Sequence, residues 1–271
     1  MQPSRGRALP IAVVLLLGAG PPAADSVLAW TKGTDERVVR EALRLMPESM
    51  RSVLTPHLDE LVAGTREAAA EEPSSVHAQN PQQTPPSSGS RLEDLVPKAV
   101  AAIDQHKPFA EVARLLGRIA HYAGDLNNPL QVAADDPDES RYAAQYSVYV
   151  EQNLKKYPLV FYGWEDQSLD PSRTAREGLR AFAEATASRA RASYAPIRAA
   201  YATDGPKSKV PLARRFDERS LPFGVGSLSW SRTVTDTARL WRHVWKHAHG
   251  DMAGTPYVTP DTPAIADKAP R

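Results

Sequence analysis

Apolar residues recur at intervals of three and four along most of this chain, the spacing that places them on one face of an α-helix. The clearest example is the central stretch 115–134 with the residues just before it, where the apolar positions are Val112, Leu115, Leu116, Ile119 and Tyr122. This helix is expected to end near Asn127, because Pro129 disfavours helical geometry in the residue before it.

Similar periodicity predicts helices over residues 36–45, 48–70, 92–105, 173–201 and 231–247. Alternation of apolar and polar residues never persists for more than a few positions, so strands are not predicted. An aromatic run at 157–164 is expected to line the core or a cleft. The pattern as a whole predicts an all-α fold with one multi-helix domain from about residue 30 to 250.

Both ends of the chain and one internal segment differ from this pattern. Residues 1–29 resemble a secretory signal peptide, with Arg5 and Arg7 before a short apolar run and a Val-Leu-Ala cleavage sequence at 27–29. An uncleaved anchor is the alternative, although the apolar run is too short to span a bilayer. Residues 73–91 are rich in Pro, Ser and Gln, and this composition predicts a mobile loop. Residues 251–271 are predicted to form a disordered tail.

Composition narrows the chemistry that the chain can perform. The formal net charge is only +1, with both signs interspersed, which gives no indication of a stable nucleic-acid partner. Cysteine is absent, which excludes disulfides, thiol catalysis and zinc–thiolate sites. A metal site in this chain therefore requires histidine and carboxylate ligands.

His121 and Asp125 are the first candidates for such a site. They lie one helical turn apart on the central helix, so their side chains project in the same direction. A neutral imidazole beside a carboxylate is a common way to present two ligands to a divalent metal. A buried histidine that bonds a neighbouring carboxylate is the alternative interpretation.

The surrounding segment, HYAGDLNNPLQVA, resembles the His-Tyr-x-Gly-Asp-x-x-x-Pro-x-His segment of the zinc-dependent phospholipase C and S1/P1 nuclease superfamily. The resemblance implies an all-helical, extracytoplasmic protein that hydrolyses phosphate esters with three zinc ions. His121 and Asp125 would then be metal ligands, and Asp125 would bridge two metals. The closing histidine of the family segment is Gln131 here, and an amide coordinates zinc poorly.

The same resemblance suggests four further site residues. Cleavage between Ala29 and Trp30 would leave an N-terminal Trp30, whose free amine and carbonyl oxygen chelate zinc in the family. Asp35 stands near the place of a family histidine, and a carboxylate can also bind zinc. Glu72 follows the helix after which the family carries an acidic ligand or base, and His77 lies where the family places another metal histidine. For these last two, an exposed helix end and a loop histidine are the alternatives.

A second metal site of the family lacks its ligands in this sequence. Active members carry His-x3-Glu on the helix after the central segment, and the corresponding positions here are Ala143 and Ser147. A register shifted by two residues gives Gln145 and Tyr149, which are no better ligands. No histidine occurs between the central helix and the last predicted helix. The sequence therefore predicts fewer bound zinc ions than the three of active members.

Two functions follow from these expectations. The first is an exported (secreted or periplasmic) zinc-dependent phosphoric ester hydrolase with reduced activity, acting on a phospholipid or nucleotide phosphate ester and without a transmembrane segment after processing. Its catalytic residues would be Glu72 and Asp125, and its metal ligands are these: Trp30, Asp35, His77, His121 and Asp125. The alternative is a non-catalytic helical domain descended from the same family.

Overall fold

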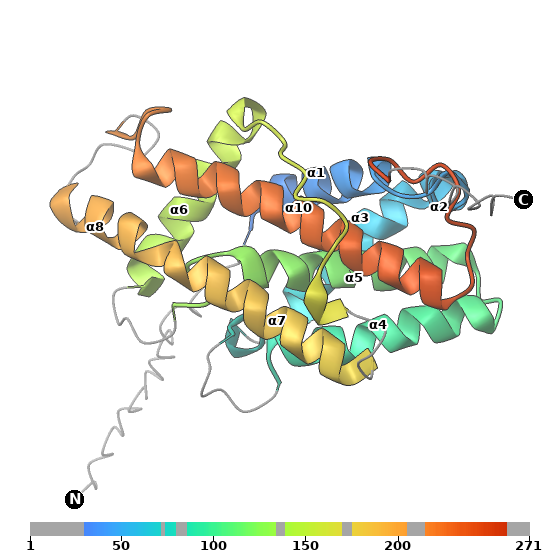
Figure 1. The fold of residues 1–271 in the computed structure, drawn as a ribbon. Helices are drawn as coiled ribbons and strands as arrows, with labels where there is room; N and C mark the ends of the chain where they lie inside the picture. Colours follow the sequence, from blue (N-terminus) through green and yellow to red (C-terminus); the bar gives the residue numbers. More distant parts are fainter. Residues whose placement is uncertain are drawn as a thin grey trace, which may run out of the picture.

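Helix α5 (Phe109–Asn127) lies in the middle of the molecule, and α3, α4 and α10 all pack against it (Figure 1). The computed structural model describes residues 30–71, 74–79, 86–133, 139–169, 175–204 and 215–258. These residues form helices and connecting segments without a strand, so the predicted all-α, single-domain fold is confirmed. The expected signal peptide, Glu72 and residues 259–271 lie outside the described residues.

The other α-helices of the described chain are these: α1 (Lys32–Arg44), α2 (Glu48–Leu54), α3 (Leu58–Glu71), α4 (Ser88–Asp104), α6 (Glu139–Asn153), α7 (Ala175–Ala192), α8 (Tyr194–Asp204) and α10 (Leu221–His247). Short 3-10 turns lie between some of them: η1 (Thr55–His57), η2 (Ser74–His77), η3 (Leu154–Lys156) and η4 (Gln167–Leu169). None of the described helices is sufficiently long and apolar to cross a membrane.

The closest helix pair in the core, α3 and α5, meets at two glycines. A Cβ atom on Gly64 would collide with the carbonyl oxygen of Arg114, and one on Gly117 would collide with the carbonyl oxygen of Leu61. Glycine at both positions lets the two backbones approach more closely than larger residues allow. On the other side of α5, the buried indole of Trp241 on α10 donates a hydrogen bond to the carbonyl oxygen of Leu116 at 2.9 Å. These contacts fix α5 on two sides.

Several predicted helix boundaries were wrong for identifiable reasons. The predicted helix 48–70 is interrupted by η1, because Pro56 lacks an N–H and disfavours a continuous helix. The predicted helix 173–201 breaks at Ser193, where α7 ends and α8 begins. Helix α10 begins ten residues earlier than expected, at a turn capped by the hydroxyl of Ser220. Helix α5 ends at Asn127, as the position of Pro129 predicted.

The predicted loop 73–91 contains more regular structure than its composition suggests. Residues Ser74–His77 form η2, and α4 starts at Ser88 rather than at residue 92. The side chains of Ser87 and Ser90 form a reciprocal capping box that begins α4 at this point. This early start brings the first turn of α4 beside η2, where Ser88 N donates to Ala78 O.

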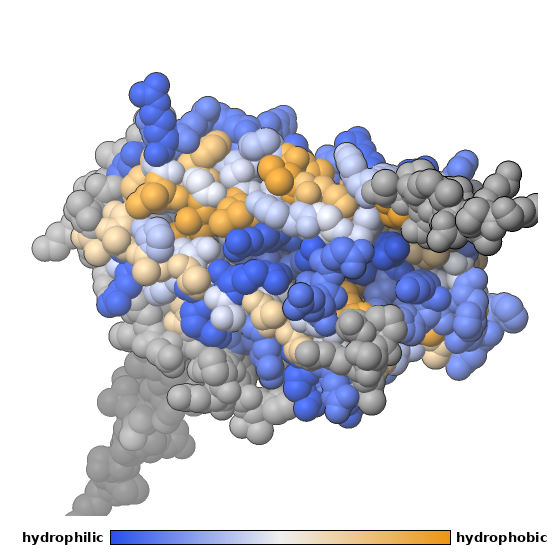
Figure 2. Space-filling model, in the orientation of Figure 1, coloured by the Kyte–Doolittle hydropathy of each residue, from blue (hydrophilic) through white to orange (hydrophobic). Residues whose placement is uncertain are grey.

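Helices α7 and α10 slope in the same direction in Figure 1 and are linked by the ion pair of Arg189 with Asp236, and the segment 157–164 crosses α10 in this view. Tyr157 at the start of this segment is buried, whereas Tyr162 is 45% exposed, so the aromatic run is divided between core and surface. Figure 2 shows hydrophobic side chains gathered on the upper part of the face seen in this view and hydrophilic ones across its middle.

Candidate metal centre

Three buried side chains meet beside the C-terminal half of α5. His77 Nδ1 lies 2.9 Å from Asp125 Oδ2 and 3.1 Å from His121 Nε2. His121 Nε2 lies 3.7 Å from the same oxygen of Asp125. The exposed fractions of His77, His121 and Asp125 are 3%, 1% and 0%. Two nitrogens and one carboxylate oxygen therefore converge in a space closed to solvent.

Local structure explains why these atoms converge. His121 and Asp125 occupy successive turns of α5 and project from the same side, as their spacing predicts. His77 reaches them from the end of η2, which has no helical periodicity in the sequence that would indicate its position. The hydroxyl of Ser88, at the start of α4, lies 3.2 Å from both Val76 O and Asp125 Oδ2, so its single proton is shared between them and connects η2 to the cluster.

Asp35 contacts the opposite edge of the His121 ring. Its Oδ2 lies 3.1 Å from His121 Nδ1, while Nε2 of that ring faces His77 and Asp125. Asp35 is therefore placed to accept a hydrogen bond from Nδ1–H, which leaves Nε2 of the neutral ring as the acceptor. A carboxylate in this position fixes the tautomer and the orientation of a metal-binding imidazole.

Burial and nearby charges shift the pKa values of His121 and Asp35. Burial alone would lower the pKa of His121, but the charge of Asp125 and the hydrogen bond and charge of Asp35 outweigh burial and raise this pKa to about 9. Burial raises the pKa of Asp35, against the opposing effect of its hydrogen bond to His121. The two carboxylates beside His121 thus favour its protonated form.

Aromatic side chains complete the walls of the cluster. The ring of Tyr122 stacks on His77 with centroids 5.9 Å apart and meets His121 edge-on at 5.5 Å. The indole of Trp30 donates a hydrogen bond to the carbonyl oxygen of Gly124 at 2.9 Å. A Cβ atom on Gly124 would lie 2.9 Å from the Trp30 ring, so glycine is needed for this approach. Trp30 therefore lies against the residue that precedes Asp125.

The cluster passes a test of fit for a divalent metal. Zinc bonds of about 2.0–2.1 Å in tetrahedral arrangement place ligand atoms about 3.4 Å apart. The three separations found here, 2.9, 3.1 and 3.7 Å, bracket that value. In addition, Asp125 Oδ1 is buried without a hydrogen-bond partner, which is costly for a carboxylate that binds nothing more. Within the described residues, no other group of ligand-type side chains converges in this way.

Three positions were expected to lack the ligands of a second metal, and Glu72 was expected to act as an acidic ligand or base. Gln131 follows α5, and its carbonyl oxygen accepts from Gln79 N at 3.2 Å, which places its backbone near the end of η2. Ala143 and Ser147 are buried on α6 and offer no strong metal ligand. Glu72 lies outside the described residues, so its predicted role stays a prediction.

Sequence reasoning missed the roles of Ser88 and Tyr122. Tyr122 stands inside the recognised segment and was assigned to the apolar face of the helix, where it also lies. Only its position directly after His121 indicated a contact with the cluster. Ser88 had no signal, because it lies in a segment whose composition predicted a loop.

The fold of this chain is similar to that of two solved alpha-toxins. The alpha toxin from Clostridium absonum superposes with a TM-score of 0.62 and 17% sequence identity over 82% of this chain. The alpha-toxin from an avian strain of Clostridium perfringens gives a TM-score of 0.60 and 13% identity over 81%. The chain spans 65% of the length of each toxin. At sequence identities this low, the comparison establishes a similar fold alone.

Comparisons of sequence give no match. No protein-family model matches the chain, and no curated protein is similar to it in sequence. The alpha-toxin fold and the cluster of His77, His121 and Asp125 are thus two separate observations.

Proposed function

We propose that this chain is an exported, zinc-binding protein of the phospholipase C type that acts on the phosphoester of phospholipid head groups with reduced turnover. The observation that carries the proposal is the convergence of His77 Nδ1, His121 Nε2 and Asp125 Oδ2 in a buried space. The similarity of fold to clostridial alpha-toxins supports it, because the sequence independently resembles the zinc-dependent phospholipase C family.

His77, His121 and Asp125 would hold the metal. A zinc ion at such a site polarises phosphoryl oxygens and lowers the pKa of a bound water. The residues of the chain prepare the site: Asp35 holds the proton on Nδ1 of His121, so that Nε2 presents its lone pair. Ser88 donates to Asp125 Oδ2 and fixes the rotation of that carboxylate.

Further ligands belong to the same proposal. Asp125 Oδ1 has no hydrogen-bond partner and is available to a second metal, as expected of a bridging carboxylate. The indole of Trp30 bonds the carbonyl oxygen of Gly124, the residue before Asp125, and processing between Ala29 and Trp30 would free the Trp30 amine as a further ligand. Glu72 as the base for water completes the predicted set. Reduced turnover follows from the absence of strong ligands at Ala143 and Ser147, because fewer positive charges then oppose the charge that develops on phosphorus.

A non-catalytic, exported helical domain is the second candidate, and the burial of the cluster favours it. A catalytic zinc keeps one position open to water and substrate, whereas a structural zinc is enclosed. Three pockets on the described surface, with volumes of about 750, 710 and 210 Å³, are lined by other side chains and not by the cluster. In this candidate zinc holds η2 and α5 together and performs no chemistry.

Two measurements on the processed protein distinguish the candidates. Elemental analysis gives its zinc content, and hydrolysis of phosphatidylcholine and of a chromogenic phosphodiester gives its turnover. Zinc with turnover that is abolished in Asp125→Asn, and retained in the exposed control Asp104→Asn, supports the hydrolase. Stoichiometric zinc without turnover supports the structural role. A protein that binds no zinc would refute the hydrolase and the structural role of zinc, and would leave a non-catalytic domain without a metal.

A further inference from the structure

A second polar site lies on the face formed by α7 and α10, apart from the elements that build the zinc cluster. It is a pocket of about 210 Å³ between these helices and the segment 157–164. Its lining residues are these: Tyr162, Arg189, Arg232, Thr235, Asp236 and Arg239. A water molecule occupies about 30 Å³ in the liquid, so a pocket of this volume has room for several waters or for an anion the size of phosphate.

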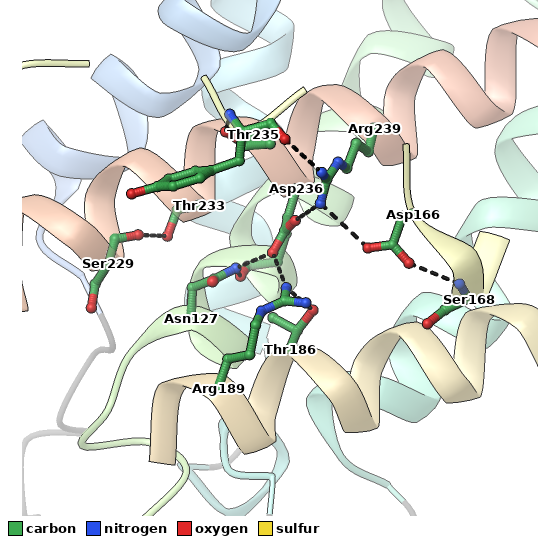
Figure 3. Close-up of polar contacts among 12 residues, drawn as sticks. Asn127, Asp166, Ser168, Thr186, Arg189, Ser229, Thr233, Thr235, Asp236 and Arg239 are labelled. Atoms are coloured by element: carbon green, nitrogen blue, oxygen red, sulfur yellow. Dashed lines mark hydrogen bonds and ion pairs between the residues drawn. The ribbon is translucent and has the colours of Figure 1, made fainter. Parts of the chain in front are cut away.

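The lining holds three arginines and one carboxylate, Asp236, which two of the arginines contact. Asp236 is buried, and its Oδ2 accepts hydrogen bonds from Asn127 Nδ2 at 3.0 Å and from Arg189 Nη2 at 3.1 Å (Figure 3). Its Oδ1 accepts from Arg239 Nη1 at 3.2 Å. The lining therefore carries three positive charges and one negative charge, an excess of two.

Four of the five N–H groups of Arg239 donate to the surrounding chain. Its Nε donates to Gly163 O at 2.9 Å, its Nη2 donates to Tyr162 O at 3.1 Å, and its Nη1 also lies 3.3 Å from Asp166 Oδ2. Asp166 does not line the pocket. It lies beside Arg239, and its negative charge offsets part of the Arg239 charge (Figure 3). The role of Arg239 is thus to hold the segment 157–164 against α10, rather than to face a ligand.

Thr235 has a similar structural role. Its hydroxyl donates to Ser231 O at 2.9 Å and accepts from Tyr162 N at 3.2 Å. Both contacts keep Tyr162 at the rim of the pocket, where its ring is 45% exposed. The hydroxyl of Thr235 has no proton left for a ligand.

Arg232 differs from the other two arginines. No described residue forms a hydrogen bond or an ion pair with its guanidinium, although the side chain is half-buried in the lining. Partial burial, and then the positive charge of Arg189, lower its pKa. Arg189 itself uses only Nη2, toward Thr186 and Asp236, so its other N–H groups are not engaged by described residues.

We propose that this pocket is an oxyanion site that binds a phosphate group between Arg232 and Arg189. A phosphate monoester carries a charge of about −1.5 to −2 near neutral pH, opposite in sign to the excess charge of the lining. Guanidinium groups bind phosphate oxygens through paired N–H···O bonds, and both arginines have such donors available. The phosphate belongs either to a free ion or to a lipid head group, and both present the same terminal oxygens.

The site is independent of the proposed zinc chemistry. Its charged residues come from α7, α10 and the segment before η4, whereas the cluster is built from α1, η2 and α5. Asn127, the last residue of α5, connects the two regions, since it lies two residues after Asp125 and bonds Asp236. Phosphate binding can therefore be measured in protein freed of metal by a chelator.

The test uses Arg232→Gln, because removing this unpaired charge breaks no ion pair of the described structure. Arg66→Gln on α3 is the matched control, since Arg66 is an exposed arginine outside the pocket. Calorimetric titration with inorganic phosphate is expected to show binding to the natural protein, weakened about tenfold or more in Arg232→Gln and unchanged in the control. Arg232→Lys, which keeps the charge but loses the planar fork, is expected to bind with intermediate affinity.

A vesicle assay separates the two sources of phosphate. Phosphatidylcholine vesicles with and without phosphatidic acid, at constant salt, are sedimented with each variant. Binding of inorganic phosphate identifies a site for the free ion, and binding only to phosphatidic acid vesicles identifies a lipid-borne phosphate. In either case the melting temperature of Arg232→Gln without phosphate should equal or exceed that of the natural protein, because a repulsion has been removed. Equal binding by Arg232→Gln and the natural protein, or binding by neither, would overturn the proposal.

Discussion

His77→Gln is the substitution that most directly tests the metal centre. The change replaces one of three converging ligand atoms with an amide, which coordinates zinc poorly, and leaves His121 and Asp125 in place. It also leaves the apolar core of α5 unaltered, because His77 reaches the cluster from η2. The expected result is a protein that folds and that has lost most of its response to zinc.

The size of that response follows from binding linkage. Zinc present at a hundredfold excess over its dissociation constant stabilises the folded protein by about 2.7 kcal/mol. For a domain of this size, 1 kcal/mol shifts the melting temperature by about 2–4 °C, so zinc should raise it by about 5–11 °C. With two ligands left, the increase in His77→Gln should fall below about 2 °C at the same zinc concentration.

The assay is thermal unfolding of chelator-treated protein with and without added zinc. His57→Gln is the control, because His57 lies on η1 outside the cluster, and its Nδ1 lies 3.8 Å from Glu60 Oε2. The control should keep the full zinc response. An equal response in His77→Gln and the natural protein would show that the zinc binds elsewhere, and the cluster would then be a hydrogen-bonded core.

Three further expectations can be measured with the same protein. Asp35→Leu removes the carboxylate that orients His121 and should weaken zinc binding about 10–100-fold, with the number of zinc ions per chain unchanged. A loss of one zinc ion per chain would instead show that Asp35 is a direct ligand. Burial, and then neighbouring basic side chains, lower the pKa of His243 from 6.5 to about 4, so the unfolded chain binds an extra proton between these values. Stability should therefore fall as the pH falls through this window, by at most about 3 kcal/mol, and His243→Gln should flatten the dependence measured by urea unfolding. Gly117→Ala should destabilise the protein by about 1–3 kcal/mol through collision with the Leu61 carbonyl, whereas Gly224→Ala, where no atom lies within 4 Å, should not.

Helix periodicity predicted the central part of the fold well. The apolar spacing and Pro129 gave both the existence and the end of α5. The boundaries that failed depend on single contacts rather than on periodicity. Ser220 starts α10 well before its apolar stripe, and Ser87 and Ser90 start α4 inside a segment whose composition predicted a loop. Capping of this kind depends on hydrogen bonds between individual side chains and the backbone, and the average composition of a segment does not reveal it.

Prediction of the site divides in the same way. His121 and Asp125 were found because their spacing on one helix fixes their relative position. His77 was proposed only from its order in a resembling family, since η2 and α5 meet through tertiary packing. The opposite-edge contact of Asp35 with His121 was not predicted at all. Which edge of an imidazole a carboxylate reaches depends on how α1 packs against α5, and no sequence spacing encodes that.

The burial of the cluster separates metal binding from turnover. Strong zinc binding requires the three ligand atoms, and these are together already. Hydrolysis also requires that a phosphoester reach the metal, and side chains exposed by no more than 3% leave a substrate no direct approach in the described part of the chain. Zinc held by such a site should exchange slowly with a chelator, because the ion must leave through packed side chains. Fast exchange would show that the cluster opens readily, and opening is the motion that a hydrolase of this construction needs.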